Sequence, residues 1–291
     1  MPIKNDVSTG TATAAAFGGA KPAWQPDSLP PFPAIALQAL KLIAGRDTSL
    51  LELCDLIRSD VAFSTAVLRF ANSPLVAFSR NITNVVQASM LLGFQRLKSI
   101  VVTVGLKAYL QGPVVPLVRS CWRHSVACAI IAERAALEGG REKDFAYTAG
   151  IMHDIGRAAM IAAAPTRYAE VLMAEADDPR ELLTREREIF GVDHCQAGGS
   201  LVKAWKLPPA FLEVTSRHHD CSPGAPGVTS IVFTSCSLAD ALGFGMLKYR
   251  SARTHEEIVS LFPEVARKGF PESSETLAAE IENEIRVMEA V

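Results

Sequence analysis

The sequence predicts an all-α protein, a multi-helix bundle of two packed sub-bundles. Apolar residues recur at helical spacing through most of the chain, and 49% of its 291 residues are hydrophobic. Short β-branched runs such as 100–104 lack flanking turns and lie inside helical patterns. A chain of this length can bury a large core, and its hydrophobic content excludes an intrinsically disordered protein.

Amphipathic segments between capping and breaking residues predict most of the helices. Asp47, Thr48 and Ser49 offer N-cap chemistry before an apolar run that starts at Leu50, and Gly93 is suited to end one helix before the next begins. The same reasoning predicts helices over residues 50–57, 61–71, 84–92, 95–106, 118–137, 145–163, 168–176, 178–190, 194–205, 208–218, 228–242 and 275–291.

The clearest break in the first half is the run Gln-Gly-Pro-Val-Val-Pro at residues 111–116. It divides the helices into an N-terminal sub-bundle over 28–112 and a second sub-bundle over 117–245, and so short a connection predicts one folding unit. Residues 1–27, rich in Thr, Ala and Gly, predict a flexible tail. The segment 246–291 predicts a helical extension, whose last helix carries an apolar stripe of Leu277, Ile281, Ile285 and Met288.

Charge and cysteine usage narrow the class of protein. Lys and Arg number 29 against 31 Asp and Glu, a formal net charge of −2, which argues against a nucleic-acid-binding surface. The N-terminus lacks the apolar block of a signal peptide, and the longest uncharged run, 221–239, holds prolines and glycines that do not suit a transmembrane helix. Six cysteines without a C-x-x-C pair predict reduced, mostly buried thiols of a cytoplasmic protein.

The sharpest chemical signal is the sequence Gly-Ile-Met-His-Asp-Ile-Gly at residues 150–156. A histidine followed directly by an aspartate can supply an imidazole nitrogen and a carboxylate oxygen to one metal ion, or to two neighbouring ions. Apolar residues on both sides predict that His153 and Asp154 lie on a buried helix, where unpartnered polar groups would be costly. Gly156 would relieve crowding beside them.

The other histidines have ordinary structural explanations when each is taken alone. His124 could be a satisfied core imidazole, His194 follows a capping Asp193, and the pair at 218–219 ends a helix, where the macrodipole favours histidine. Asp240 could face solvent. Because each lies on a different helix or helix end, the set also fits an inward-facing metal site in a helical bundle. The candidate ligands are His124, His153, Asp154, His194, His218, His219 and Asp240.

Several further motifs, taken in order along the chain, resemble those of one family. They are Leu-Pro-Pro-Phe-Pro at 29–33, Leu-Arg-Phe-Ala-Asn-Ser-Pro at 68–74, Trp-Arg-His-Ser at 122–125, the motif at 150–156, Glu-Ile-Phe-Gly-Val-Asp-His at 188–194, Ala-Trp-Lys-Leu-Pro at 204–208 and Arg-His-His-Asp at 217–220. The family is HDOD, the HD-related output domains within the HD superfamily of metal-dependent phosphohydrolases. The resemblance covers residues 28–245 and implies an HD-like arrangement in the C-terminal half.

The resemblance also implies a function. HDOD proteins are regulatory modules of bacterial signal transduction rather than demonstrated enzymes, so a signalling protein is the expected partner and a nucleotide a candidate ligand. Two departures from the related HD-GYP phosphodiesterases count against hydrolysis. No Gly-Tyr-Pro follows the histidine pair, and Arg157 stands where active HD enzymes often carry Lys. Neither departure removes a candidate metal ligand.

The alternative is a metal-dependent phosphohydrolase that acts on a nucleotide or a cyclic dinucleotide. One or two ions of Fe, Mn, Zn or Ni would then lower the pKa of a bridging water, and Arg123 or Arg157 would contact the phosphate. Whether the protein is an enzyme stays open at this point. The sequence shows no basic cluster near the histidines, and this favours a regulatory module that binds without hydrolysing.

Overall fold

The protein is seen here in a computed structural model, which describes residues 31–44, 49–76, 82–110, 115–136, 141–173, 179–222, 224–246 and 253–290. Every regular element in these ranges is a helix, so the predicted all-α class is confirmed. The predicted tail at 1–27 and most of the predicted break at 111–116 lie outside the described residues.

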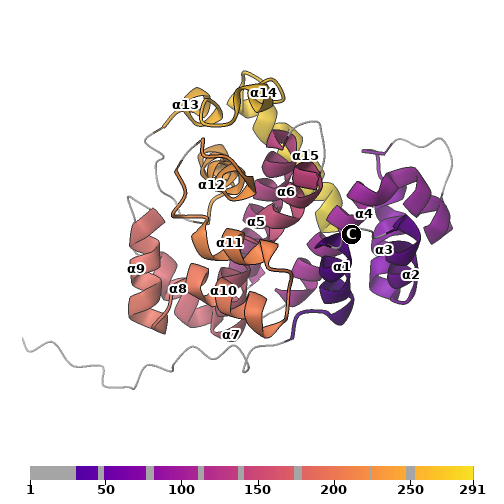
Figure 1. The fold of residues 1–291 in the computed structure, drawn as a ribbon, viewed down its shortest axis with the longest axis horizontal. Coiled ribbons are helices and arrows are strands. Elements are labelled where there is room, and N and C mark those ends of the chain that lie inside the picture. Colours follow the sequence, from indigo (N-terminus) through magenta and orange to yellow (C-terminus); the bar gives the residue numbers. More distant parts are fainter. Residues whose placement is uncertain are drawn as a thin grey trace, which may run out of the picture.

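The elements are α1 (Ala34–Ala44), α2 (Leu50–Arg58), α3 (Val61–Ala71), α4 (Val85–Tyr109), α5 (Val115–Ala135), α6 (Arg141–Met152), α7 (Ile155–Ala163), α8 (Pro165–Met173), α9 (Pro179–Phe190), α10 (His194–Ala204), α11 (Ala210–Arg217), α12 (Val228–Ala239), the π-helical turn η2 (Asp240–Phe244), α13 (His255–Val259), α14 (Glu264–Arg267) and α15 (Ser274–Ala290). Figure 1 shows α1 to α4 gathered on one side of the molecule. The helix α15 contacts α4, α5 and η2, and so touches both groups of helices.

Local capping chemistry sets where the N-terminal helices begin. Ser49 and Glu52 form a capping box at α2: the Ser49 hydroxyl accepts from the Glu52 backbone N–H at 3.2 Å, and the Glu52 carboxylate accepts from the Ser49 N–H at 2.8 Å. Asn84 caps α4 by accepting from the Val86 N–H at 2.8 Å. The helix α4 then bends at Gly93, where φ is 75°, a value that favours glycine. Gly93 is non-helical and separates two helical stretches within α4, so the predicted split at Gly93 is confirmed.

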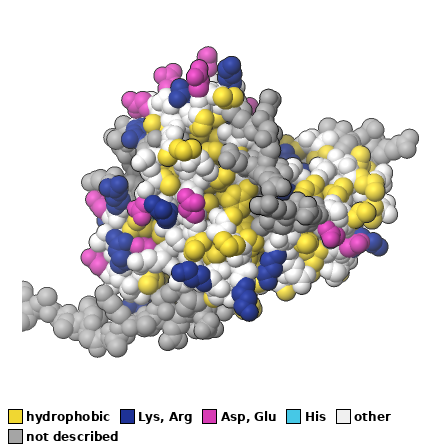
Figure 2. Space-filling model, viewed as in Figure 1, with side chains coloured by type: hydrophobic (Ala, Val, Ile, Leu, Met, Phe, Trp, Pro, Cys, Tyr) yellow, Lys and Arg dark blue, Asp and Glu magenta, His cyan; other side chains and the backbone are white. Residues whose placement is uncertain are grey.

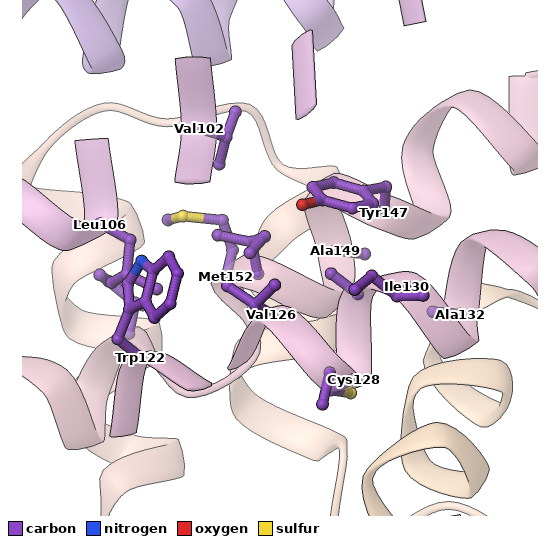
Figure 3. Packing of buried hydrophobic residues seen from close by; sticks show 14 of the residues in the cluster. Val102, Leu106, Trp122, Val126, Cys128, Ile130, Ala132, Tyr147, Ala149 and Met152 are labelled. Carbon is purple, nitrogen blue, oxygen red and sulfur yellow. The ribbon is translucent and has the colours of Figure 1, made fainter. Parts of the chain in front are cut away.

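The second group of helices is built around α5, which contacts α6, α7, α12 and α15. Figure 3 shows Trp122 and Val126 of α5 packed together with Tyr147 and Met152 of α6. The indole Nε1 of Trp122 donates to the Thr103 carbonyl of α4 at 3.2 Å, and the Thr103 hydroxyl lies 2.8 Å from the Tyr147 hydroxyl. These contacts hold α4 against α5 and α6 and so join the two groups.

One described helix, α4, is long and apolar enough to cross a membrane by length and composition. More than half of its most apolar window is buried inside the protein, and the helix is kinked at Gly93. The helices α1, α2 and α3 all pack against it. Its apolar character is therefore accounted for by its place in the core.

Charged side chains of both signs cover the surface. Figure 2 shows Lys and Arg side chains interspersed with Asp and Glu over one face, with hydrophobic side chains between them. The exposed apolar side chains of the described N-terminal helices include Leu51, Val61 and Met90. The mixture agrees with the formal net charge of −2.

The predicted helix over 145–163 is wrong as a single element. The helix α6 ends at Met152 and α7 begins at Ile155, so His153 and Asp154 lie in the turn between two helices rather than on a continuous one. Helical periodicity is a local signal that continues on both sides of this turn, and for that reason the sequence does not reveal the change of direction.

Gly156 lies where α7 packs closely on α10. A Cβ atom at this position would clash with the backbone of His194 and Gly198, so glycine is what lets the two helices touch. The crowding that the sequence predicts at Gly156 thus comes from another helix, distant in the chain. The predicted helix over 228–242 also ends early, because its α-helical part stops at Ala239 and η2 follows.

The C-terminal helix α15 is fastened to α5 by apolar contacts and by ion pairs. On α5, Arg119 Nε lies 2.9 Å and Arg123 Nη1 3.0 Å from the Glu289 carboxylate, and Arg123 also pairs with Glu282. The predicted apolar stripe is confirmed, because its four members are all buried: Leu277, Ile281, Ile285 and Met288.

Candidate metal centre

The predicted ligands come from five separate places in the fold and meet in one cluster. They lie in the middle of α5 (His124), in the turn between α6 and α7 (His153 and Asp154), at the first residue of α10 (His194), at and just after the end of α11 (His218 and His219) and at the first residue of η2 (Asp240). Five of the seven are at most 1% exposed: His124, His153, Asp154, His194 and His218.

Local structure aims these side chains inward. Asp193 is the N-cap of α10, as predicted: its carboxylate accepts from the Gln196 N–H at 2.8 Å, and the Gln196 side chain accepts from the Asp193 N–H at 3.2 Å. His194 therefore starts the helix at a defined place. Asp154 occupies the equivalent position before α7 but makes no side-chain capping bond, so its carboxylate remains available to the cluster.

The Asp154 carboxylate is the centre of the cluster. Its Oδ2 atom lies 3.5 Å from His153 Nε2 and 3.7 Å from His124 Nε2. Its Oδ1 atom lies 3.4 Å from Nε2 of both His194 and His218. On the far side of His124, the Nδ1 atom lies 3.4 Å from Asp240 Oδ1. One carboxylate thus stands between two groups of imidazoles.

Three of the imidazoles, those of His153, His194 and His218, are held at Nδ1 and turn Nε2 inward. Nδ1 of His153 lies 2.6 Å from the Gly150 carbonyl, and Nδ1 of His218 lies 3.0 Å from the Val214 carbonyl. These carbonyls require Nδ1 to donate, which leaves Nε2 as an acceptor, the form that binds metals. Burial lowers the pKa of His153 to about 3, so its imidazole is neutral at pH 7.

His194 is held by a carboxylate that the sequence analysis missed. Glu186 is fully buried, and its Oε2 lies 2.7 Å from His194 Nδ1 and accepts from the His194 backbone N–H at 2.8 Å. Its Oε1 accepts from the Tyr168 hydroxyl at 2.5 Å. Burial alone would lower the pKa of His194, but the Glu186 charge raises it to about 10. A sequence signal did exist: Glu186 lies four residues from both Leu182 and Phe190, on the buried face of α9.

Both arginines predicted to contact phosphate are paired with carboxylates. Arg157 is 5% exposed, and its Nη1 lies 2.7 Å from Asp154 Oδ2 and its Nη2 3.3 Å from His194 Nε2. Arg123 is held by Glu282 and Glu289 of α15. Arg157 enters the cluster from the first turn of α7, so this predicted phosphate contact does lie beside the histidines, as a single cation and not as a basic cluster.

Two cysteines join the cluster. Cys195 Sγ lies 4.0 Å from His218 Nε2, and Cys236 Sγ lies 3.5 Å from His124 Nε2. All six cysteines are free thiols, in agreement with the sequence prediction, but these two are more than core side chains. Burial alone would raise the pKa of Cys195, yet the charges of His218 and His194 lower it to about 6. No spacing signal marks either cysteine in the sequence.

The residues present fit a divalent transition metal. His124 Nδ1, His153 Nε2 and both Asp154 oxygens are buried without a hydrogen bond of good geometry in the described part of the chain. Buried polar atoms without partners are costly, and a metal would satisfy them. Imidazole, carboxylate and thiolate are all ligands of divalent transition metals. Three donor groups have atoms within 4.8 Å of one another: His194, Cys195, His218 and His219; His124, His153 and Cys236; His153, Asp154 and His218.

A pocket of about 420 Å³ lies between α5, η2 and α15, and its lining includes none of the candidate ligands. Arg123 and Glu282 line it together with residues 242–245 of the segment that begins at Asp240. The side chain of Asp240 is 14% exposed, whereas that of His124 beside it is 1% exposed. Asp240 is thus less buried than His124, and it begins the segment that continues into the pocket lining at Leu242.

The chain matches a family model and several known proteins. The model, described as the HDOD domain, matches residues 29–221. An uncharacterized protein of Treponema pallidum (strain Nichols) is 24% identical over 204 residues, which cover 69% of this chain and 39% of that protein. The chain thus spans about two fifths of the length of this relative.

Solved structures share the fold. An HDOD domain protein of unknown function from Geobacter sulfurreducens has a TM-score of 0.66 at 22% identity, over 91% of this chain and 92% of its own. A Shewanella amazonensis protein, provisionally assigned as a metal-dependent phosphohydrolase, has a TM-score of 0.58 at 20% identity, over 90% of this chain and 91% of its own. A Marinobacter aquaeolei protein, provisionally assigned to signal transduction, has a TM-score of 0.65 at 19% identity, over 90% of this chain and 60% of its own.

Proposed function

The chain belongs to the HDOD family, and from this premise we propose that it is a regulatory module of bacterial signal transduction whose buried cluster holds a divalent metal without catalysing hydrolysis there. One observation carries the non-catalytic part: Arg157, the cation nearest the cluster, is buried in an ion pair with Asp154. A guanidinium that a carboxylate of the protein already holds is less available to contact a substrate phosphate.

The metal would be held by two groups of ligands on either side of Asp154. His124, His153 and Asp240 lie on one side, and His194, His218 and His219 lie on the other. A bound divalent ion would supply positive charge and Lewis acidity. The chain itself fixes the imidazoles through hydrogen bonds at Nδ1, and the tight packing of α7 on α10 at Gly156 excludes water from this side.

Such a module would act through a surface that binds a partner protein. The exposed apolar residues Leu51, Val61 and Met90 on α2 to α4 belong to helices that pack on the cluster-bearing helices through α4. We propose a signalling protein as the partner, a nucleotide as a candidate ligand and the bacterial cytoplasm as the location. The six free cysteines support a reducing compartment.

Metal content tests the first part of the proposal. Purified wild-type protein should carry Fe, Mn, Zn or Ni at near-stoichiometric amounts by elemental analysis. Asp154→Asn should lose most of the metal, because it removes the charge of the central carboxylate. Asp220→Asn, at an exposed aspartate beside His219, is the matched control and should keep the wild-type content. A metal-free wild type, including after reconstitution with each ion, would refute metal binding.

A metal-dependent phosphohydrolase remains the second candidate, since the donor set is complete and the 420 Å³ pocket lies next to the segment that begins at Asp240. Assays with cyclic di-GMP, linear dinucleotides and nucleoside phosphates, with added Mn²⁺ or Fe²⁺, separate the two functions. We expect no turnover. Metal-dependent hydrolysis that disappears in His153→Ala would establish the enzyme and overturn the regulatory proposal.

A further inference from the structure

We propose that Cys195 is a metal ligand and that, with His194, His218 and His219, it forms a thiolate site selective for Zn²⁺-like ions over Mn²⁺ and Mg²⁺. The inference rests on the proposed function in requiring that the cluster binds metal, and it assigns a ligand that the predicted set lacks. All four residues offer donor atoms within 4.8 Å of one another.

The spacing of the nitrogen atoms matches tetrahedral coordination. An ion with bonds of about 2.0 Å to nitrogen places tetrahedral nitrogen ligands roughly 3.3 Å apart. Nε2 of His194 lies 3.3 Å from Nε2 of His218 and 3.1 Å from Nε2 of His219. His194 and His218 are each held at Nδ1, so these Nε2 atoms keep their direction.

Cys195 lies next to these histidines. Its Sγ atom lies 3.9 Å from Nδ1 and 4.0 Å from Nε2 of His218, and the residue is 7% exposed. Its position directly after His194, in the first turn of α10, is fixed by the Asp193 cap. The sulfur is thus held beside the histidines by the same capping box that places His194.

Charge balance favours the thiolate over the nearest carboxylate. Asp154 Oδ1 also lies 3.4 Å from His194 Nε2, but the charge of this carboxylate is paired with Arg157 at 2.7 Å. The same guanidinium approaches His194 Nε2 to 3.3 Å. A metal placed among neutral imidazoles next to Arg157 needs a further anion, and Cys195 supplies one. Only thiolate sulfur and unprotonated Nε2 atoms bind the metal, so any proton on Cys195 Sγ or on Nε2 of the three histidines leaves to solvent as the bonds form.

The other half of the cluster is chemically different. His124 and His153 there are accompanied by the carboxylates of Asp154 and Asp240, the harder ligands. Cys236 lies 3.5 Å from His124 and is the obvious competitor as a sulfur ligand. It provides a matched control, since it is also a buried cysteine beside a cluster histidine.

Co²⁺ is the probe, because a thiolate ligand gives it a near-ultraviolet charge-transfer band that imidazole and carboxylate ligands do not. Metal-free full-length protein is titrated with Co²⁺ and the absorption spectrum is recorded. We expect the band in wild type and in Cys236→Ser, and its loss in Cys195→Ser. The preference for Zn²⁺ over Mn²⁺ should fall at least about tenfold in Cys195→Ser only.

The outcomes separate this inference from the metal site itself. Visible cobalt bands without the charge-transfer band, or a band lost only in Cys236→Ser, overturn the Cys195 assignment while the metal site stands. No cobalt binding at all overturns both. If Cys195→Ser fails to fold, the rate at which Cys195 is alkylated in folded wild-type protein decides. Zn²⁺ should lower this rate at least about tenfold, because ligation removes the nucleophilic thiolate. An unchanged rate refutes the proposal.

Discussion

Arg157 lies with its guanidinium Nη1 2.7 Å from Oδ2 of Asp154, the carboxylate at the centre of the histidine cluster. The two residues are only 5% and 1% exposed. Burial alone would raise the pKa of Asp154, but Arg157 and His153 bring it well below its usual value. The buried carboxylate is therefore charged and compensated by the protein itself, before any metal binds.

Replacing Arg157 with methionine leaves Asp154 buried without its cation. We expect metal-free Arg157→Met to lose about 3–5 kcal/mol of unfolding free energy, the usual cost of breaking a buried pair. Zn²⁺ should restore more stability to this variant than to wild type, because the metal then supplies the missing positive charge. Urea unfolding with and without Zn²⁺ measures both effects.

The matched control is Arg58→Met, which removes an exposed pair with Asp55. Its unfolding free energy should change by less than about 0.5 kcal/mol. An equal response to Zn²⁺ in wild type and Arg157→Met would contradict the idea that Arg157 and the metal serve the same carboxylate.

Glu186 should act as a positioning residue for His194. In Glu186→Gln the side chain keeps its shape but loses the charge that faces His194 Nδ1 at 2.7 Å. We expect the metal affinity to fall by about 10- to 100-fold, as for other residues that orient metal-bound histidines. Competition with a chromophoric chelator measures the affinity.

Tyr168→Phe is the comparison, since it removes only the hydroxyl that donates to Glu186. It should lower the unfolding free energy by about 1 kcal/mol and the metal affinity less than Glu186→Gln does. If both variants bound metal like wild type, Glu186 would have a purely structural role.

The docking of α15 should weaken in acid. The hydrogen bond from Arg119 lowers the pKa of Glu289 below its usual 4.5. Partial burial opposes this effect, and Arg123 adds to it. A carboxyl group whose pKa is depressed in the folded protein stabilises the fold at pH values above its pKa in the unfolded chain. That contribution is lost as the pH falls through the pKa of the folded protein. Glu289→Gln should therefore have a lower melting temperature than wild type at pH 7, and the difference should shrink in solutions more acidic than 4.5.

Circular dichroism melts across this pH range measure the difference. Glu188→Gln, at an exposed glutamate of α9, is the control and should track wild type at every pH. A Glu289→Gln difference that stays constant into acid would mean that the Arg119 and Arg123 ion pairs contribute nothing to the docking of α15.

Helix boundaries set by capping residues were predictable from the sequence. Ser49 caps α2, and Asp193 caps α10, because a cap satisfies backbone N–H groups only two or three residues away. The turn at His153 and Asp154 was not predictable, because the close approach that accompanies it involves the backbone of α10, some forty residues along the chain. Local periodicity carries no record of such a contact.

The sequence by itself determined the all-α class, the capped helix starts and the residue types that can bind a metal, because these depend on periodicity and side-chain chemistry. Only the tertiary structure decided which charges meet. It pairs Arg157 with Asp154, Arg123 with α15, and Glu186 with His194, and it brings Cys195 beside His218. Arg157 and Asp154 lie three residues apart and Glu186 and His194 eight, but the other contacts join residues far apart in the sequence. For the buried pairs of Arg157 with Asp154 and Glu186 with His194, loss of one partner is costly, because it leaves an uncompensated charge in the core.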